Sequence, residues 1–144
     1  MSEQGNDNVE RGEGWACASL DDLGEGPGFR KIRGPLGVTA FGVNAIVLPA
    51  GYATGSHFHD EQEELYFVHS GRVAIEFGDG SVQELGPGGL AWVDAPTQRR
   101  LRNLSDTEEA VYVIVGGKDG YVGRDGALPE DEVSRFGDDA PPGA

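Results

Sequence analysis

The chain has little cysteine and no long apolar run, and each shortage excludes a class of protein. Cys17 is the single cysteine among 144 residues, which excludes an internal disulfide framework and a metal cage built from several thiolates. No stretch approaches the ~18 apolar residues that a membrane-spanning helix needs. The start, MSEQGNDNVE, lacks the basic and apolar regions of a signal peptide. The sequence therefore predicts a cytoplasmic protein with no membrane partner.

Positive charge is also scarce. The chain has 11 lysines and arginines against 25 aspartates and glutamates, so its formal net charge is -14 and its pI is near 4.4. A field of this sign repels phosphate backbones and anionic lipid surfaces. Nucleic acids are therefore not expected as partners.

Glycine is abundant, and the apolar residues between the glycines follow a period of two. There are 24 glycines in 144 residues, whereas an average protein has ~7%. Short runs of this kind, separated by regular turn signals, indicate antiparallel strands in a sandwich or barrel. Ser70-Gly71 indicates a hairpin between two of these strands. The predicted strands cover residues 38–48, 65–69, 72–77, 81–85, 90–93, 100–104 and 110–116.

The predicted fold class is therefore all-β, with one domain. We expect a mobile tail at 1–14, a β-barrel domain at 15–117 and a C-terminal extension at 118–144. In the segment 128–137 of the extension, a proline lies near the start, acids fill the first turn and Gly137 is the last residue. These features are typical of a short helix.

Two of the three histidines, His57 and His59, lie two residues apart, and Glu64 follows five residues later. In an extended strand, residues two apart point to the same side. A loop at 60–63 can return Glu64 to face the two rings. Two imidazoles and one carboxylate suit a divalent ion such as Fe(II), Mn(II), Zn(II), Ni(II) or Cu(II). The pattern predicts a metal site, although a His-x-His pair also occurs on plain polar strand ends, and Glu63 competes with Glu64 for the ligand role.

The surrounding residues resemble the first sequence motif of the cupin superfamily. Gly51 is followed by x5-His57-x-His59, then by x4-Glu64 and x6-Gly71. The second motif of that superfamily, P-x-G-x2-H-x3-N, is similar to residues 94–103, and Asn103 matches its asparagine. Arg99 stands where that motif has its histidine, and its proline and glycine are replaced as well. The resemblance covers residues 36–117.

The resemblance implies a small barrel of two antiparallel sheets with a metal in its mouth. Many cupins hold the ion with three histidines and a glutamate, and this chain offers His57, His59 and Glu64. A guanidinium cannot donate a lone pair to a metal, so Arg99 leaves three alternatives. The site is a two-histidine, one-carboxylate set with open positions, or Arg99 holds an anionic substrate beside the ion, or the ion is lost and Arg99 pairs with Glu64.

Strand alternation orients the side chains near this site. Arg99 is expected to point into the barrel, whereas Arg100 and Arg102 lie on the solvent face. Tyr66 shares a face with Glu64, where it lines the pocket, donates a proton or packs in the core. His69 is predicted on the opposite face from Glu64.

These residues and the resemblance lead to one leading hypothesis. The chain is expected to be a divalent-metal-binding cupin that binds or acts on a small, anionic organic molecule, with contacts from Arg99 and Tyr66. Its chemistry as an enzyme would be that of a dioxygenase, an isomerase or a lyase, and no residue is singled out as catalytic. The alternative is a non-catalytic ligand-binding or sensing barrel built around Arg99 with a degenerate metal site. A third hypothesis is a structural dimer with a vestigial site. Because edge strands of small sheets need covering, a homodimer is expected.

Overall fold

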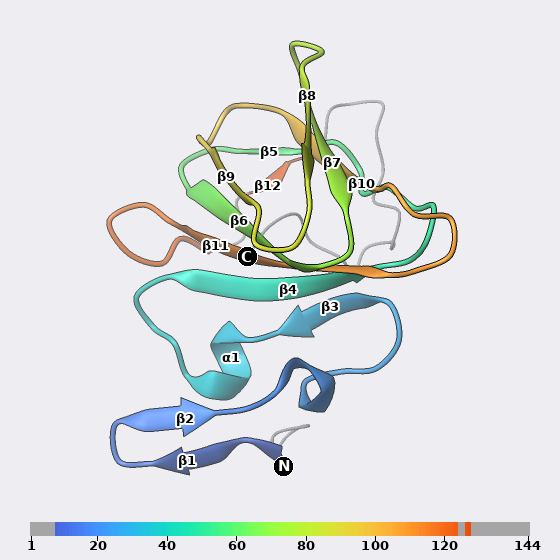
Figure 1. The fold of residues 1–144 in the computed structure, drawn as a ribbon. Coiled ribbons are helices and arrows are strands. Elements are labelled where there is room, and N and C mark those ends of the chain that lie inside the picture. Colours follow the sequence, from blue (N-terminus) through green and yellow to red (C-terminus); the bar gives the residue numbers. More distant parts are fainter. Residues whose placement is uncertain (1–7, 124–125, 128–144) are drawn as a thin grey trace.

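The computed structural model describes residues 8–123 and 126–127 (Figure 1). Almost every regular element in that part of the chain is a β-strand, which confirms the all-β prediction. The predicted helix at 128–137 lies outside the described residues. The strands are β1 (Glu10–Gly12), β2 (Trp15–Cys17), β3 (Gly28–Lys31), β4 (Gly42–Leu48), β5 (Phe58–His59), β6 (Glu63–Ser70), β7 (Val73–Phe77), β8 (Val82–Leu85), β9 (Leu90–Val93), β10 (Arg99–Asn103), β11 (Ala110–Gly117) and β12 (Gly126–Ala127).

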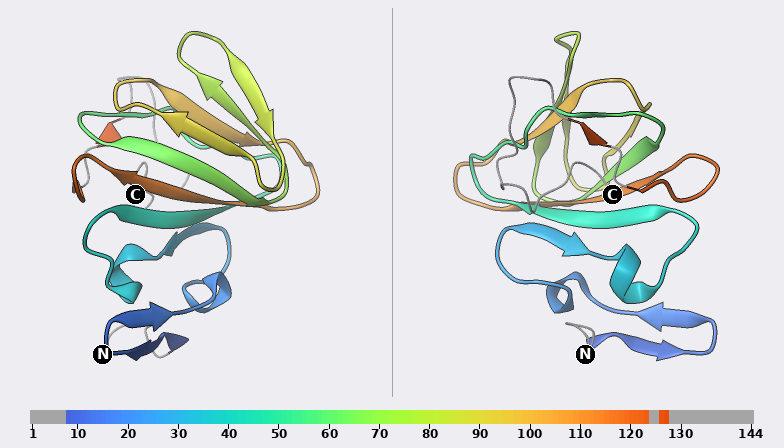
Figure 2. Two further views of the ribbon diagram at one scale, coloured as in Figure 1. Left: turned by 60° about the vertical axis from the view of Figure 1, so that its left-hand side comes forward. Right: turned by 180° about the vertical axis from the view of Figure 1, so that it is seen from behind.

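Two antiparallel sheets form the barrel. A five-stranded sheet has the order β3-β4-β11-β6-β9, and a three-stranded sheet has the order β10-β7-β8. The turned view in Figure 2 shows them as two layers that close at one end of the molecule. The short pair β12-β5 adds to the barrel wall, and β1 pairs with β2 in a separate hairpin.

The core lies between the two sheets because the strands alternate between buried and exposed residues. In β6 every second side chain from Glu64 onward is buried, and β10 and β11 repeat the pattern. Burial of such apolar side chains removes them from water, which contributes about 1.5–3 kcal/mol for each large one. The buried core consists of Ile46, Leu48, Tyr66, Val68, Val73, Ile75, Val93, Leu101, Ala110, Tyr112 and Ile114.

The turn at Ser70-Gly71 does not make the predicted hairpin. β6 pairs with β11 and β9, whereas β7 pairs with β10 and β8, so the turn carries the chain from one sheet to the other. Gly71 has a φ of 80°, which favours glycine, and a Cβ there would lie 2.8 Å from the Cα of Ala110. The sequence signal was for a tight turn, and it carries no information about which strands then pair.

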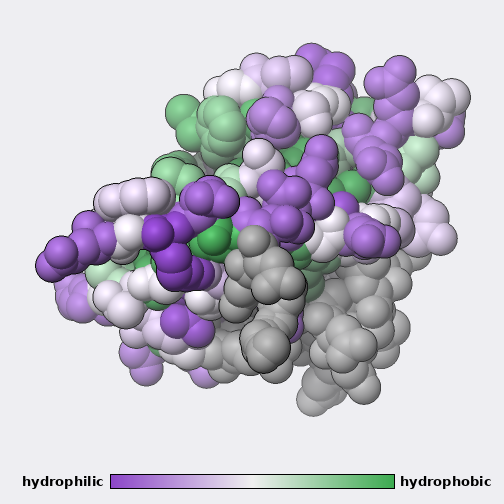
Figure 3. Space-filling view, turned by 90° about the horizontal axis from the view of Figure 1, so that it is seen from below, coloured by the Kyte–Doolittle hydropathy of each residue, from purple (hydrophilic) through white to green (hydrophobic). Residues whose placement is uncertain are grey.

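The segment before β4 lies along the β4 side of the five-stranded sheet, and its own β3 pairs with β4 as the outer strand of that sheet (Figure 1). It contains the β1-β2 hairpin, a 3-10 turn at Leu20–Asp22, β3 and the short helix α1 (Arg33–Leu36). The hairpin straddles the boundary between the expected tail and the expected domain. With four residues, α1 is the single α-helix in the described part of the chain, where no helix is long and apolar enough to cross a membrane. Seen from below, this side of the molecule is largely hydrophilic, with smaller apolar areas (Figure 3).

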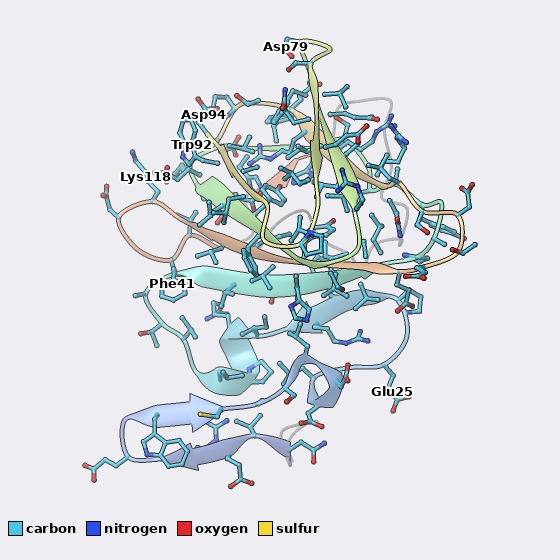
Figure 4. The ribbon with its side chains drawn as sticks, viewed as in Figure 1. Glu25, Phe41, Asp79, Trp92, Asp94 and Lys118 are labelled. Atoms are coloured by element: carbon cyan, nitrogen blue, oxygen red, sulfur yellow. The ribbon has the colours of Figure 1, made fainter. Side chains whose placement is uncertain are left out.

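An apolar row remains on the outer face of the five-stranded sheet. Leu65 and Phe67 on β6 lie opposite Trp92 and Leu90 on β9, and all four side chains are at least 40% exposed. Trp92 and the following Asp94 lie at one end of the barrel (Figure 4). β9 is also the edge strand of this sheet, so the apolar row extends to the edge of the sheet.

Candidate metal site

His57, His59 and Glu64 converge inside the barrel. His59 ends β5, His57 lies one residue before β5, and Glu64 is the second residue of β6. The three residues are 6%, 1% and 1% exposed. One possible ligand atom from each lies within 4.8 Å of the other two. Among the described residues, these three form the group of histidines and acids that is close enough to hold a metal ion. The loop at 60–63 therefore returns Glu64 to the imidazoles, as the spacing predicts.

Backbone hydrogen bonds fix the two histidines against the segment that resembles the second motif. The amide of His57 donates to the carbonyl of Arg99 at 3.0 Å, and the amide of Arg99 donates to the carbonyl of His57 at 2.9 Å. The amide of His59 donates to the carbonyl of Ala95 at 2.8 Å. His57 and Arg99 are therefore directly opposed residues, and their side chains share one face.

The two oxygens of the Glu64 carboxylate have different neighbours. Oε1 accepts hydrogen bonds from the hydroxyl of Tyr66 at 2.7 Å and from Nη2 of Arg99 at 3.2 Å. Oε2 lies 3.2 Å from Nε2 of His59, while Oε1 lies 3.9 Å from Nε2 of His57. One oxygen is thus anchored by the protein, and the other faces a histidine nitrogen.

Arg99 is fully buried and points into the barrel, as alternation predicts. Its Nη1 donates to the carbonyls of Ala95 and Thr97, its Nε donates to the hydroxyl of Tyr66 at 3.3 Å, and its Nη2 donates to Glu64. Of the three alternatives for Arg99, the ion pair with Glu64 is therefore present in the structure. The pair uses Oε1 of Glu64, so it leaves the histidine-facing Oε2 in place.

The protonation states at the site follow from burial and from the charges nearby. Burial lowers the pKa of His57, and the charge of Arg99 lowers it further against the opposing effect of Glu64. Burial alone would raise the pKa of Glu64, but the neighbouring His57 and His59 rings and the Arg99 charge outweigh it and lower that pKa. His57 is therefore neutral and Glu64 ionised at neutral pH. These are the forms in which both side chains can bind a metal.

One pair of atoms in the donor set has the spacing of two ligands of a single ion. Two ligand atoms that each lie ~2.1 Å from one ion, at angles of 90–110°, are about 3.0–3.4 Å apart. The 3.2 Å between His59 Nε2 and Glu64 Oε2 lies in this range. Nε2 of His57 is buried and makes no hydrogen bond within the described chain. Binding of a cation by that atom would therefore break no hydrogen bond of the described chain.

Sequence reasoning missed Gln62, which is 1% exposed and contacts the site directly. Its side-chain nitrogen lies 3.0 Å from Nδ1 of His59. Residues 62, 64 and 66 share the buried face of this segment, so the period of two contained the signal. The residue was overlooked because the acidic stretch around it is typical of a solvent-exposed loop.

Tyr66 packs in the core, which is one of the roles considered for it, and its hydroxyl donates a hydrogen bond to Glu64. Burial raises the pKa of its hydroxyl well above the usual value, and the Glu64 charge raises it further. The hydroxyl therefore keeps its proton and acts as a donor. Its ring centroid lies 6.2 Å from that of Tyr112, which is also fully buried.

Several other residues singled out in the sequence lie away from the site. His69 is exposed, as predicted from its position relative to Glu64. Arg100 and Arg102 both pair with Glu76 on the outer face. Glu63 is exposed and accepts a hydrogen bond from the indole of Trp92, so Glu64 and not Glu63 faces the histidines.

Asn103 and Asp94 hold loops. The Asn103 amide donates to the carbonyls of Leu48, Pro49 and Glu108. Asp94 accepts a hydrogen bond from the hydroxyl of Thr97, whose carbonyl in turn accepts from Arg99. Asp94 therefore supports the loop whose carbonyls bind the guanidinium. Among the described residues, no hydrogen bond joins Asp94 to the guanidinium itself.

Comparison with known proteins agrees with this geometry. The model of the cupin domain family matches residues 44–116, which include the histidines, Glu64 and Arg99. No protein in the curated set matches the chain.

Solved structures show the same fold. An uncharacterized conserved protein with a double-stranded β-helix domain from Klebsiella pneumoniae has a TM-score of 0.66 and 21% identity, over 80% of this chain and 97% of that one. A cupin-superfamily sugar phosphate isomerase from Silicibacter pomeroyi has a TM-score of 0.61 and 22% identity, over 76% and 71% of the two chains. The DMSP lyase DddQ from Ruegeria pomeroyi has a TM-score of 0.54 and 19% identity, over 62% of this chain and 43% of that lyase.

The present chain thus spans less than half of the DMSP lyase that it matches, while it spans nearly all of the Klebsiella protein. At these identities the likeness concerns the fold: a double-stranded β-helix of two antiparallel sheets. With the family model matching residues 44–116, the chain belongs to the cupin family.

Proposed function

We propose that the protein binds one divalent transition metal through His57, His59 and Glu64, and that it binds or acts on a small anionic organic molecule beside the ion. The observation that carries the proposal is the convergence of three buried ligand side chains within 4.8 Å. Burial of two histidines and a glutamate together is costly for a protein unless the polar groups are used.

Two histidines and one carboxylate leave several coordination positions open, since residue 99 cannot supply a fourth ligand. When bound there, an iron, manganese, zinc, nickel or copper ion supplies Lewis acidity or, for a redox-active metal, a place for dioxygen. The residues of this chain set the conditions around it. Tyr66 and Arg99 hold Oε1 of Glu64, so that Oε2 is turned toward His59.

The charges of the buried groups support an anionic ligand. With the histidines neutral, the charges of Glu64 and Arg99 cancel, so a divalent ion brings the site to a net charge of about +2. A set of three histidines and one glutamate would reach only about +1 with the same ion. Replacement of a histidine by Arg99 thus makes the loaded site more attractive to a carboxylate or phosphate.

Arg99 and Tyr66 are predicted to contact this ligand. Arg99 would attract it by its charge and Tyr66 would pack against it, and neither would need an unused hydrogen-bond donor. Arg99 already makes four hydrogen bonds within the protein. The isomerase and the lyase among the similar structures act on small organic molecules by their names. An isomerase or lyase reaction is accordingly our proposal for the enzymatic form of this function, beside the dioxygenase reaction that a bound iron would permit.

A second candidate function is ligand binding or sensing without a metal. The ion pair between Arg99 and Glu64 favours it, because this pair satisfies the buried carboxylate without any ion. In that case the barrel would retain its structure and bind an anion whether or not a transition metal is present.

Metal content separates the two functions. The purified protein is compared by elemental analysis with the His57→Ala/His59→Ala variant and with His69→Ala, which removes an exposed histidine and serves as the matched control. We expect near-stoichiometric metal in the wild type and in His69→Ala, and none in the double variant. Absence of bound metal from all three, even after anaerobic incubation with Fe(II), Mn(II) and Zn(II), would refute the metal proposal and favour the second function.

A further inference from the structure

Gln62 contacts Nδ1 of His59, while the other nitrogen of that ring lies next to Glu64. Its side-chain nitrogen lies 3.0 Å from Nδ1 of His59, and both residues are 1% exposed. The other nitrogen of the same ring, Nε2, lies 3.2 Å from Oε2 of Glu64. The ring of His59 is therefore held from both sides, by an amide at Nδ1 and by a carboxylate at Nε2.

The observed arrangement corresponds to one tautomer of His59. An amide N–H of Gln62 that donates to Nδ1 requires a lone pair on Nδ1, so the ring proton of the neutral imidazole is on Nε2. In that tautomer Nε2–H lies next to Oε2 of Glu64, with 3.2 Å between the nitrogen and the oxygen. In this tautomer Nε2 has no free lone pair, and His59 cannot bind a metal through it.

Rotation of the Gln62 amide by 180° produces the other tautomer without moving any backbone atom. The amide oxygen and nitrogen then exchange positions, and they differ little in size. The oxygen then accepts a hydrogen bond from Nδ1–H, and Nε2 presents its lone pair toward Glu64. In this change Nε2 loses its proton and Nδ1 gains one, so the ring stays neutral. The proton on Nδ1 is hydrogen-bonded to the amide oxygen.

Gly116 on β11 gives the Gln62 amide its place. A Cβ at Gly116 would lie 2.8 Å from Oε1 of Gln62 and 3.2 Å from the amide carbon. Gly116 has no positive φ that would require glycine, and it lies in a regular strand opposite Glu64. The missing side chain therefore serves the close approach of Gln62 to the strand.

We propose that Gln62 is a positioning residue that sets the tautomer of His59, with its amide donating to Nδ1 in the metal-free protein and accepting from Nδ1 in the metal-bound protein. The inference rests on the metal site proposed above. Groups that orient a ligating histidine through its second nitrogen commonly change metal affinity by about 10- to 100-fold. Gln62 differs from a carboxylate or a carbonyl in that role, because its amide can serve both tautomers.

The direct test is the protonation pattern of the His59 ring, read from its two nitrogen chemical shifts by NMR in ¹⁵N-labelled wild-type protein. We expect the Nε2–H form without metal and the Nδ1–H form after addition of one equivalent of Zn(II). The same tautomer in both states would overturn the inference. This measurement needs no substitution, so it does not depend on the folding of any variant.

Two variants test the two halves of the proposal. Gln62→Glu provides an acceptor only, so Nδ1 of His59 is expected to carry a proton before metal is added, and Zn(II) affinity is expected to be equal to or above that of the wild type. Gln62→Met keeps the length and removes both hydrogen-bonding roles, and its Zn(II) affinity in a chelator competition is expected to fall about 10- to 100-fold. Gln83→Met, on the exposed face of β8, is the matched control and should bind as the wild type does.

The outcomes distinguish this inference from the proposed function. If the wild type binds Zn(II), and loses it in His57→Ala/His59→Ala, but Gln62→Met binds it equally well, the role of Gln62 is wrong and the metal site stands. If the wild type binds no metal, both proposals fail together.

Discussion

The buried ion pair between Arg99 and Glu64 should couple far more strongly than a similar pair on the surface of the same protein. Arg99 Nη2 and Glu64 Oε1 are 3.2 Å apart with both side chains fully buried. Arg99→Leu leaves the Glu64 carboxylate without its cation and the carbonyls of Ala95 and Thr97 without their donor. Removal of one partner of a buried pair costs about 3–5 kcal/mol of unfolding free energy.

This cost is large enough to appear in a melting curve. For a chain of about 150 residues, 1 kcal/mol corresponds to about 2–4 °C in Tm, so Arg99→Leu should melt about 6–20 °C below the wild type. The coupling is measured by a double-mutant cycle with Glu64→Gln, using denaturant unfolding of the metal-free proteins. Because Glu64→Gln removes the charge that Arg99→Leu leaves unpaired, the double variant should be less destabilised than the sum of the single variants.

Arg100 and Glu76 supply the matched control. Their atoms are closer, at 2.7 Å, but the two side chains are 34% and 21% exposed. Water screens such a pair, so the same cycle with Arg100→Leu and Glu76→Gln should give a coupling of only about 0.2–1 kcal/mol. An equal or larger coupling at the surface pair, or strict additivity at Arg99 and Glu64, would refute the reasoning that burial decides the energy of the inner pair.

Four other perturbations have defined outcomes. Arg99→His places a third imidazole beside His57 and should tighten Zn(II) binding in a chelator competition, whereas unchanged affinity would show that residue 99 is not the fourth-ligand position. Tyr66→Phe removes the 2.7 Å hydrogen bond to Oε1 of Glu64 and should lower the unfolding free energy by about 1.5–3 kcal/mol in denaturant titrations; no change would mean that this bond is not formed. Because burial lowers the pKa of His57, the unfolded chain gains a proton first as the pH falls below ~6.5, so Tm should decline there, and the decline should be shallower in His57→Gln. A Tm that falls equally in both would contradict the burial argument. Trp92→Glu should convert the expected homodimer to a monomer in light scattering, and a monomeric wild type would refute that expectation.

The ligand group was predictable because strand alternation and short loops are local properties of the sequence. The two-residue spacing of His57 and His59 turns both to one side of the strand, and a short loop after them can bring Glu64 back to face them. The inward direction of Arg99 and the outward direction of His69 follow from the same period of two. All of these are confirmed by the burial of the residues.

The features that the sequence did not predict depend on contacts between segments that are distant along the chain. The pairing of β6 with β11 rather than β7 is decided by which sheet faces bury apolar area, and the Ser70-Gly71 turn is compatible with either outcome. The hydrogen bond from Arg99 to Glu64, 35 residues away, depends on the closure of the barrel. Gln62 was hidden for a related reason, because its neighbours are polar and only the closed barrel makes position 62 interior.

The central claim is that one metal ion is held by His57, His59 and Glu64, and anomalous diffraction tests it most directly. A crystal of the protein grown with one equivalent of Zn(II) is measured above and below the zinc absorption edge. We predict a single strong anomalous peak at bonding distance, ~2.0–2.2 Å, from Nε2 of both histidines and from a carboxylate oxygen of Glu64. Density for the intact Arg99–Glu64 pair with no anomalous peak between the two histidines would contradict the account.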